Sequence, residues 1–187
     1  LPKISENIHR AKTWFKNAIE KHNYKGSYNY CYCTKSSHFE HVLNEALKND
    51  IHIETSAAFD INIVEKLKKT GKISNDTYVI CNGFKRDQYI TNIANLINSG
   101  HNNCIPIIDN YEEIDLLSEE IEGKYKIGIR IASEEEPKFE FYTSRLGIGY
   151  KNIVPFYNKK VKENEQVELK MLHFFINTGI KDNSYYW

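Results

Sequence analysis

Residues 77–108 read TYVICNGFKRDQYITNIANLINSGHNNCIPII and contain one complete strand–helix–strand unit. The apolar run at 77–81 predicts a strand, and Asn82-Gly83 after it is a turn dipeptide suited to positive φ. Apolar residues then recur at helical spacing until Gly100, which is typical of a helix end. A second apolar run at 104–108 predicts the next strand. These helical positions are Ile90, Ile93, Ala94 and Ile97.

The same unit repeats along most of the chain. Predicted strands begin near residues 28, 51, 77, 104, 126 and 168, at roughly 25-residue intervals until an irregular stretch at 132–150. Helices are expected at 5–21, after Ser37, where Glu40 completes a capping box, at 59–67, at 90–97, and after Asp109, which offers a cap with Glu112. Residues 151–162 are ambiguous. Alternating strands and helices at this spacing predict βαβ units and a parallel sheet.

Either a barrel or an open doubly wound sheet fits this repeat. No GxGxxG or GxxxxGK[ST] motif occurs, which disfavours dinucleotide-binding and P-loop folds. The balance therefore favours a (β/α)8 barrel, and because a full barrel needs about 250 residues, only about six units are present and the chain is expected to be a fragment. Pro106 argues mildly against a central position for its strand, unless a bulge or strand start accommodates it.

Composition excludes several classes of protein. The 187 residues include 25 Lys+Arg and 25 Asp+Glu, and 41% are hydrophobic, so neither a disordered chain nor a basic nucleic-acid-binding domain is expected. No apolar run is long enough for a membrane span, and the start does not resemble a signal peptide. The four cysteines lack CxxC spacing, so we expect buried free thiols in a cytoplasmic protein.

Polar residues follow the predicted strands, where a parallel barrel gathers its chemistry. Lys35 ends the first strand before a helix start, and desolvation together with the positive helix end would free its amine for a Schiff base. A solvated surface lysine is the plain alternative. Glu54, Asn82, Asp109, Arg130 and Asn177-Thr178 occupy the equivalent positions after or within later strands.

Each of these candidates also has an ordinary structural interpretation. Glu54 is equally compatible with a solvated loop carboxylate. Arg130 lies in an apolar strand, so it should pair with a carboxylate or an anionic ligand. Arg145 lies in the loop Thr143-Ser-Arg-Leu-Gly147, with a small residue before it and a glycine after. His173 is more typical of a core residue than of a ligand, and because no Cys/His set has metal spacing, no metal site is expected.

Several segments together resemble the biosynthetic arginine decarboxylases, within the pyridoxal-phosphate (PLP) barrel class that includes ornithine and diaminopimelate decarboxylases. They occur in the family's order over nearly the whole chain, and Cys-Asn-Gly-Phe-Lys points to the arginine branch. The segments are Tyr32-Cys-Thr-Lys35, Ile53-Glu-Thr-Ser-Ala-Ala-Phe-Asp60, residues 79–87, Ile127-Gly-Ile-Arg-Ile131, Ser144-Arg-Leu-Gly147 and residues 172–178.

The resemblance implies a cofactor role for six residues. Lys35 matches the lysine that forms the Schiff base with PLP, and it is the one catalytic residue implied. Glu54 and Arg130 match residues close to the cofactor. Arg145 matches the basic residue of a [KR]-[FL]-G loop, Phe175 stands where a histidine stacks on the pyridine ring, and Thr178 matches a serine that helps hold the phosphate.

Phe175 and Asn177 depart from the family pattern, because Phe cannot titrate or donate a hydrogen bond and Asn177-Thr178 replaces a Gly-Ser pair. The resemblance implies that residues 1–187 are an incomplete PLP-binding barrel domain without the family's C-terminal β domain, and that this fragment alone is inactive. It implies decarboxylation of L-arginine to agmatine and CO2 in polyamine biosynthesis, by a homodimer with shared active sites. Ornithine, diaminopimelate or carboxynorspermidine as substrate, and a non-catalytic binding homologue, remain alternatives.

Overall fold

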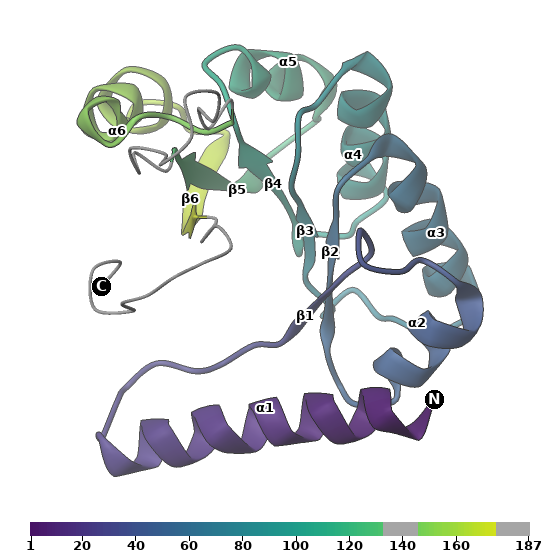
Figure 1. Cartoon of the computed structure of the whole chain (residues 1–187). Helices are drawn as coiled ribbons and strands as arrows, with labels where there is room; N and C mark the ends of the chain where they lie inside the picture. The colour runs from purple at the N-terminus through teal and green to yellow at the C-terminus, as the bar shows by residue number, and fades with distance from the viewer. Residues whose placement is uncertain (133–145, 175–187) are drawn as a thin grey trace, which may run out of the picture.

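The computed structural model describes residues 1–132 and 146–174. Six parallel strands form one curved sheet in the order β1-β2-β3-β4-β5-β6 (Figure 1). The strands are β1 Cys31–Cys33, β2 His52–Thr55, β3 Val79–Cys81, β4 Cys104–Ile108, β5 Tyr125–Ile131 and β6 Val167–Phe174.

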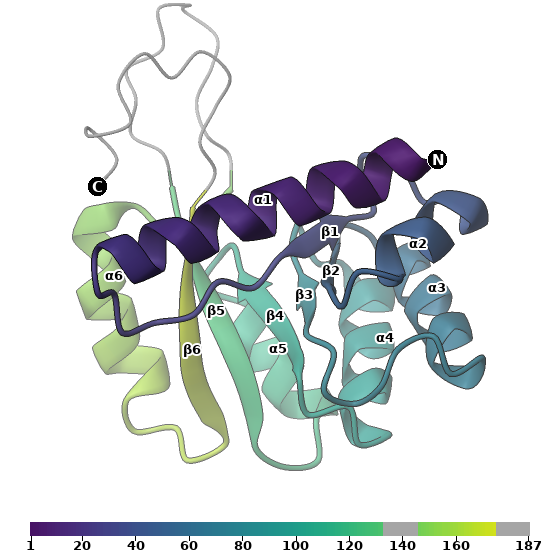
Figure 2. The same ribbon diagram turned by 90° about the horizontal axis from the view of Figure 1, so that it is seen from below.

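Helices follow the strands in alternation, as the sequence predicts. Those between the strands lie along the outer side of the curved sheet (Figures 1 and 2). No helix among the described residues is long and apolar enough to cross a membrane. The helices are α1 Pro2–Lys21, α2 Glu40–Leu47, α3 Ala58–Lys69, α4 Asp87–Asn98, α5 Glu113–Glu120 and α6 Tyr150–Phe156, which continues into the π-helical segment η1 Tyr157–Val161.

The strand order decides between the two parallel architectures. A doubly wound sheet reverses its strand order at a switch point, so that helices cover both faces. Here each strand pairs with the next in sequence, without reversal. Within the described residues, β1 and β6 have no pairing with each other. The fold is therefore the barrel type that the sequence favours, with six of its β/α units present.

The two faces of the sheet are filled differently. The large core lies between the outer face and the helices, where Ile53, Val79 and Ile129 meet the apolar sides of α3, α4 and α5. A smaller cluster fills the inner face, with Ile80, Ile105 and Ile107 at its centre and Cys31, Tyr78 and Met171 around it. We call this inner cluster the apolar plug. It leaves the carboxyl ends of the strands as the polar side of the barrel.

Two predicted helix caps are wrong. The chain turns after β1, where Ser36 N donates to Cys33 O at 3.2 Å, so α2 begins at Glu40 with Phe39 before it, and Ser37 does not cap it. At α5 the side chain of Asn110, rather than that of Asp109, accepts hydrogen bonds from the backbone nitrogens of Glu112 and Glu113, at 3.0 and 3.1 Å.

The expectation that Pro106 avoids a central strand is also wrong. β4 is central, but it pairs with β3 through 104–106 and with β5 through 107–108, so Pro106 lies where the pairing changes sides.

Gly83 provides a test of how the loops after β2 and β3 fit together. It has φ +87°, and a Cβ there would lie 2.8 Å from the backbone oxygen of Ser56. Gly100 has φ +90° but open space around it. Both Gly→Ala changes carry the cost of positive φ, about 1 kcal/mol, whereas Gly83→Ala also forces two backbones apart and should lose about 1–3 kcal/mol more. Urea unfolding of the two variants measures the difference, and equal losses would contradict the close loop contact.

Candidate active site

Polar side chains from all six strands lie at the carboxyl ends, directly beyond the apolar plug. Side chains alternate along each strand, so the residue two positions after a plug residue faces the same side. Asn82 follows Ile80 in this way, Asp109 follows Ile107, and His173 follows Met171. We call these residues the polar layer. Its members are Cys33, Glu54, Asn82, Asp109, Arg130 and His173.

Lys35 stands just after β1, beside this layer. It is exposed, and α2 begins only at Glu40, so the predicted burial against a helix end is wrong. The preceding residue, Thr34, is buried and firmly held: its hydroxyl donates to Asp60 Oδ2 at 2.8 Å. Asp60 also accepts from Ser56 N at 2.9 Å, so one buried carboxylate joins the loops after β1 and β2. The backbone that carries Lys35 is fixed while its amine stays accessible.

Glu54 is half-buried rather than a solvated loop carboxylate. Asn82 Nδ2 donates to its Oε1 at 3.0 Å, and the Cys33 thiol lies 3.9 Å from the same oxygen. Burial raises the pKa of Cys31, with a further contribution from Glu54, to about 11. Burial is also the main cause that raises the pKa of Cys33. Both thiols are therefore protonated at neutral pH. The expected thiols are free, although only Cys81 and Cys104 are fully buried.

Arg130 pairs with a carboxylate, as the sequence predicts for a charge in an apolar strand. Its Nε lies 3.8 Å from Asp109 Oδ1, and one terminal nitrogen donates to Asn82 Oδ1 at 3.4 Å. Asn82 thus contacts both Glu54 and Arg130, and it links an anion on β2 to a cation on β5. The result is a continuous line of contacts from β1 to β5 across the mouth of the barrel.

Lys85 and Glu113 form a buried pair beside this line, and neither was a sequence candidate. Both side chains have at most 1% of their surface exposed, and Lys85 Nζ lies 3.2 Å from Glu113 Oε2. Lys85 Nζ also donates to the carbonyl oxygens of Gly83, at 2.9 Å, and Ile107. Glu113 in turn accepts from the backbone nitrogens of Lys85 and Asp109. The pair therefore locks the loops after β3 and β4 together.

His173 lies in this layer rather than in the core. It pairs in register with Arg130, so the two side chains occupy neighbouring positions on the inner face. Burial lowers its pKa, while Glu54 acts in the opposite direction, so the ring is neutral at neutral pH. Its Nδ1 is buried, and within residues 1–132 and 146–174 it has no hydrogen-bond partner. The predicted site residues Arg145, Phe175 and Thr178 lie outside the described residues.

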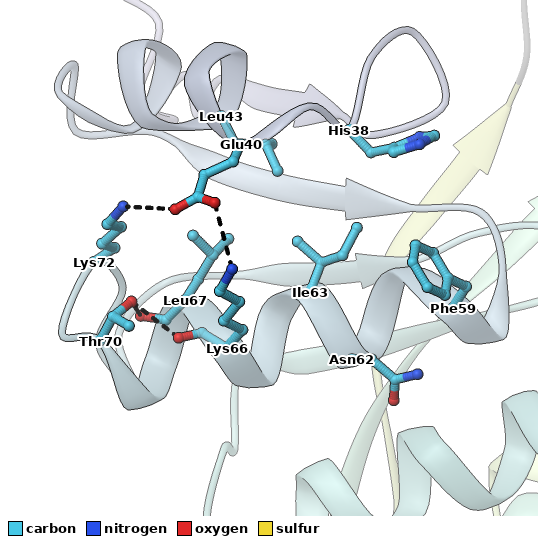
Figure 3. A pocket seen from close by; sticks show the side chains of 10 residues that line it. All are labelled: His38, Glu40, Leu43, Phe59, Asn62, Ile63, Lys66, Leu67, Thr70 and Lys72. Carbon is cyan, nitrogen blue, oxygen red and sulfur yellow. Dashed lines mark hydrogen bonds and ion pairs between the residues drawn. The ribbon is translucent and has the colours of Figure 1, made fainter.

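A separate hollow lies on the outer side of the barrel. This groove of about 360 Å³ runs between α2 and α3, with Leu43, Ile63 and Leu67 in its wall and Glu40 between two lysines at one end (Figure 3). None of Lys35, Glu54 and Arg130 lines it. The described candidate residues therefore meet at the carboxyl ends of the strands rather than in this groove.

Sequence comparison finds similarity to arginine decarboxylases. No family model matches the chain. Seven curated relatives are named biosynthetic arginine decarboxylase. The relative from Synechocystis sp. is 22% identical over 197 residues, which cover 96% of this chain and 30% of the relative. The chain thus spans about three tenths of the length of this relative.

Structural comparison finds the same fold in solved decarboxylases. Diaminopimelate decarboxylase from M. jannaschii, in complex with L-lysine, has a TM-score of 0.76 at 18% identity, over 99% of this chain and 42% of that one. Biosynthetic arginine decarboxylase from Campylobacter jejuni has a TM-score of 0.70 at 21% identity, over 91% and 28%. A SrLDC variant in complex with PLP has a TM-score of 0.60 at 14% identity, over 78% and 35%. These likenesses establish the fold.

Asp60 allows a test of how Lys35 is positioned. Asp60→Ala removes the buried acceptor that the Thr34 hydroxyl and the Ser56 N–H share, and it leaves Thr34 with the Glu54 carbonyl oxygen at 3.2 Å and Ser56 N–H unpaired, which should cost about 1–3 kcal/mol of unfolding free energy. Asp87→Ala is the matched control, because Asp87 is also in the first turn of a 12-residue helix but is exposed. It should cost less than about 1 kcal/mol. Urea unfolding compares them, and a similar loss in both would show that the Asp60 contacts carry no special weight.

Proposed function

We propose that this chain is part of the barrel domain of a PLP-dependent decarboxylase that acts on a basic amino acid, with L-arginine as substrate and agmatine and CO2 as products. The polar layer at the mouth of the barrel, with the accessible Lys35 beside it, is the observation that carries the proposal. The similarity to biosynthetic arginine decarboxylases supports the choice of arginine.

The described residues fit a bound pyridoxal phosphate. An accessible lysine amine is the group that attaches to the cofactor's aldehyde carbon, and Lys35 supplies it next to a fixed backbone. Arg130 supplies a positive charge at the mouth for an anionic group. The buried Nδ1 of His173, which has no partner among the described residues, supplies an open hydrogen-bonding position toward a ligand. By the resemblance, Arg145, Phe175 and Thr178 complete the site around the ring and the phosphate.

The mechanism assigns separate tasks to the residues of the site. When bound, the cofactor supplies an electron sink for loss of CO2. Lys35 would hold the cofactor through its side-chain amine. Arg130 is positioned by its ion pair with Asp109 and its hydrogen bond to Asn82, and it would place a positive charge beside an anionic group. The apolar plug excludes water from beneath the polar layer, so these charges act in a medium of low dielectric.

We also propose the assembly that the resemblance implies. The protein would act as a cytoplasmic homodimer in which each active site takes residues from both subunits. Residues 1–187 would then form the incomplete barrel domain, with the β domain supplied by sequence outside this chain. The share of the relatives that the chain covers supports the incomplete domain, and the homodimer rests on the resemblance alone.

A non-catalytic homologue that binds a partner is the second candidate. The observation in its favour is sequence-based: Phe175 and Asn177 replace residues that the resembled family uses at the cofactor. Lys35, Glu54 and Arg130 argue for the enzyme, because a pure binding protein has no need for an accessible lysine beside buried charges. The two candidates differ in their response to loss of Lys35.

The proposal predicts that Lys35 is the attachment point of the cofactor. Addition of PLP to the purified protein should give a visible absorption band, and borohydride should fix the label on the peptide that contains Lys35. Lys35→Ala should lower the trapped label at least roughly tenfold, since Lys85, which also lies beside the polar layer, is fully enclosed. Lys48→Ala is the control, because its side chain is 68% exposed on the neighbouring helix, and it should trap normally. Label scattered over surface lysines would reject the proposal and favour the binding homologue.

Substrate choice is tested with the full-length protein, because the proposed active site needs residues outside this chain, by CO2 release from arginine, ornithine, lysine and diaminopimelate. We expect kcat/KM for arginine to exceed the others by at least about tenfold, because a site that pairs a guanidinium rejects shorter or differently charged groups. Higher activity with another of these amino acids would keep the decarboxylase but replace its substrate.

A further inference from the structure

Asp109 has an unusual environment for a buried carboxylate. Its side chain is 1% exposed, and within the described residues neither oxygen has a hydrogen-bond donor. Among the described residues its side-chain oxygens form two ion pairs, with Lys85 Nζ at 3.9 Å from Oδ2 and with Arg130 Nε at 3.8 Å from Oδ1. Buried carboxylates usually gain several hydrogen bonds, so the charge of Asp109 rests on these two neighbours.

The two cations differ in how far their side chains are enclosed by the protein. Lys85 is completely enclosed, and three acceptors take its three N–H bonds: Gly83 O, Ile107 O and Glu113 Oε2. Its position is therefore fixed. Arg130 faces the mouth of the barrel, with 12% of its side chain exposed. Lys85 is fixed on the closed side of Asp109, and Arg130 is partly exposed at the mouth of the barrel. Asp109 therefore acts mainly on Arg130.

We propose that Asp109 is a positioning residue for Arg130, and that Lys85 is the buried counter-cation that keeps Asp109 ionised. We call the two ion pairs Lys85–Asp109 and Asp109–Arg130 the relay. It runs from the loop after β3, through the end of β4, to β5. Asn82 fixes a second nitrogen of Arg130 from β3, so the guanidinium is held from two strands on one side. This assignment rests on the proposed function only in what Arg130 then contacts, namely an anionic group of the cofactor or substrate.

The charge balance around the relay supports this arrangement. Glu113 is the other carboxylate close to Lys85, but its oxygens already accept from two backbone nitrogens as well as from Lys85. It is therefore fully paired without Arg130. Asp109 is the carboxylate that contacts both cations, and burial raises its pKa while Lys85 and Arg130 act in the opposite direction. Removal of Lys85 would favour the neutral acid of Asp109, which attracts Arg130 less strongly.

A double-mutant cycle on the purified protein tests the relay. The variants are Asp109→Asn, Arg130→Met and the double variant, and the readouts are PLP affinity and the absorption band of bound PLP. If Asp109 acts through Arg130, Asp109→Asn weakens PLP binding roughly tenfold, and the double variant binds no more weakly than Arg130→Met alone. Both single variants should shift the band in the same direction. Unchanged affinity in Asp109→Asn, or losses that multiply in the double variant, would overturn the proposal.

Two further variants separate charge from structure. Asp115→Asn removes an exposed carboxylate that pairs with Lys160 on the surface, and it should leave both readouts unchanged. Lys85→Met combined with Glu113→Gln removes the counter-cation together with the carboxylate that Lys85 neutralises. It should weaken PLP binding in the same direction as Asp109→Asn but by less, because the loss of Glu113 partly offsets the loss of Lys85 at Asp109. Normal affinity in this variant would exclude Lys85 from the relay.

The same cycle distinguishes failure of the relay from failure of the proposed function. If the unaltered protein does not bind PLP, the proposed function fails. Urea unfolding of the unliganded variants then still measures the coupling between Asp109 and Arg130. Non-additive effects on unfolding would support the relay on its own, and additive effects would overturn it.

Discussion

The polar layer depends on the apolar plug directly beneath it. Ile80, Ile105 and Ile107 fill the concave side of the sheet, with Met171 packed against them, and they exclude water from the barrel below the charged residues. Without this filling, Arg130, Asp109 and Lys85 would be solvated, and their mutual attractions would fall toward the small values of surface pairs. The same plug makes every charge above it costly unless it is paired. Strong interactions and strict pairing are thus two results of one packing arrangement.

Strict pairing explains the order in which the charges lie. Lys85 and Glu113 neutralise each other behind the site, where they also satisfy backbone groups of the loops after β3 and β4. Arg130 and Glu54 lie nearer the mouth, and Asn82 separates them as a neutral side chain that contacts both. The closed side is therefore rigid and balanced, while the open side keeps charges that a ligand can reach.

The sequence predicts the alternation of strands and helices well, because both periodicities are local properties of short segments. It also predicts that Arg130 pairs with a carboxylate or an anionic ligand, since an unpaired charge in an apolar strand is costly, and the structure places Asp109 there. The cap at Ser37 fails because the turn after β1 delays the helix to Glu40. Lys85 could not be found in this way: its burial is decided by Glu113, 28 positions later in the sequence, and by the closing of two loops. The sequence favours the core for His173, because a strand pattern shows which residues share a face but not where along the barrel that face becomes polar.

Deamidation of Asn82 would alter the polar layer over time. It precedes Gly83, and asparagine is among the residues most easily lost on heating or storage, through hydrolysis of its side-chain amide. The product at this position would be an acid within hydrogen-bonding distance of Glu54. Two carboxylates would then share a place where a neutral amide now keeps an anion and a cation apart. Asn82 now links Glu54 to Arg130, and its deamidation would place a second negative charge beside Glu54.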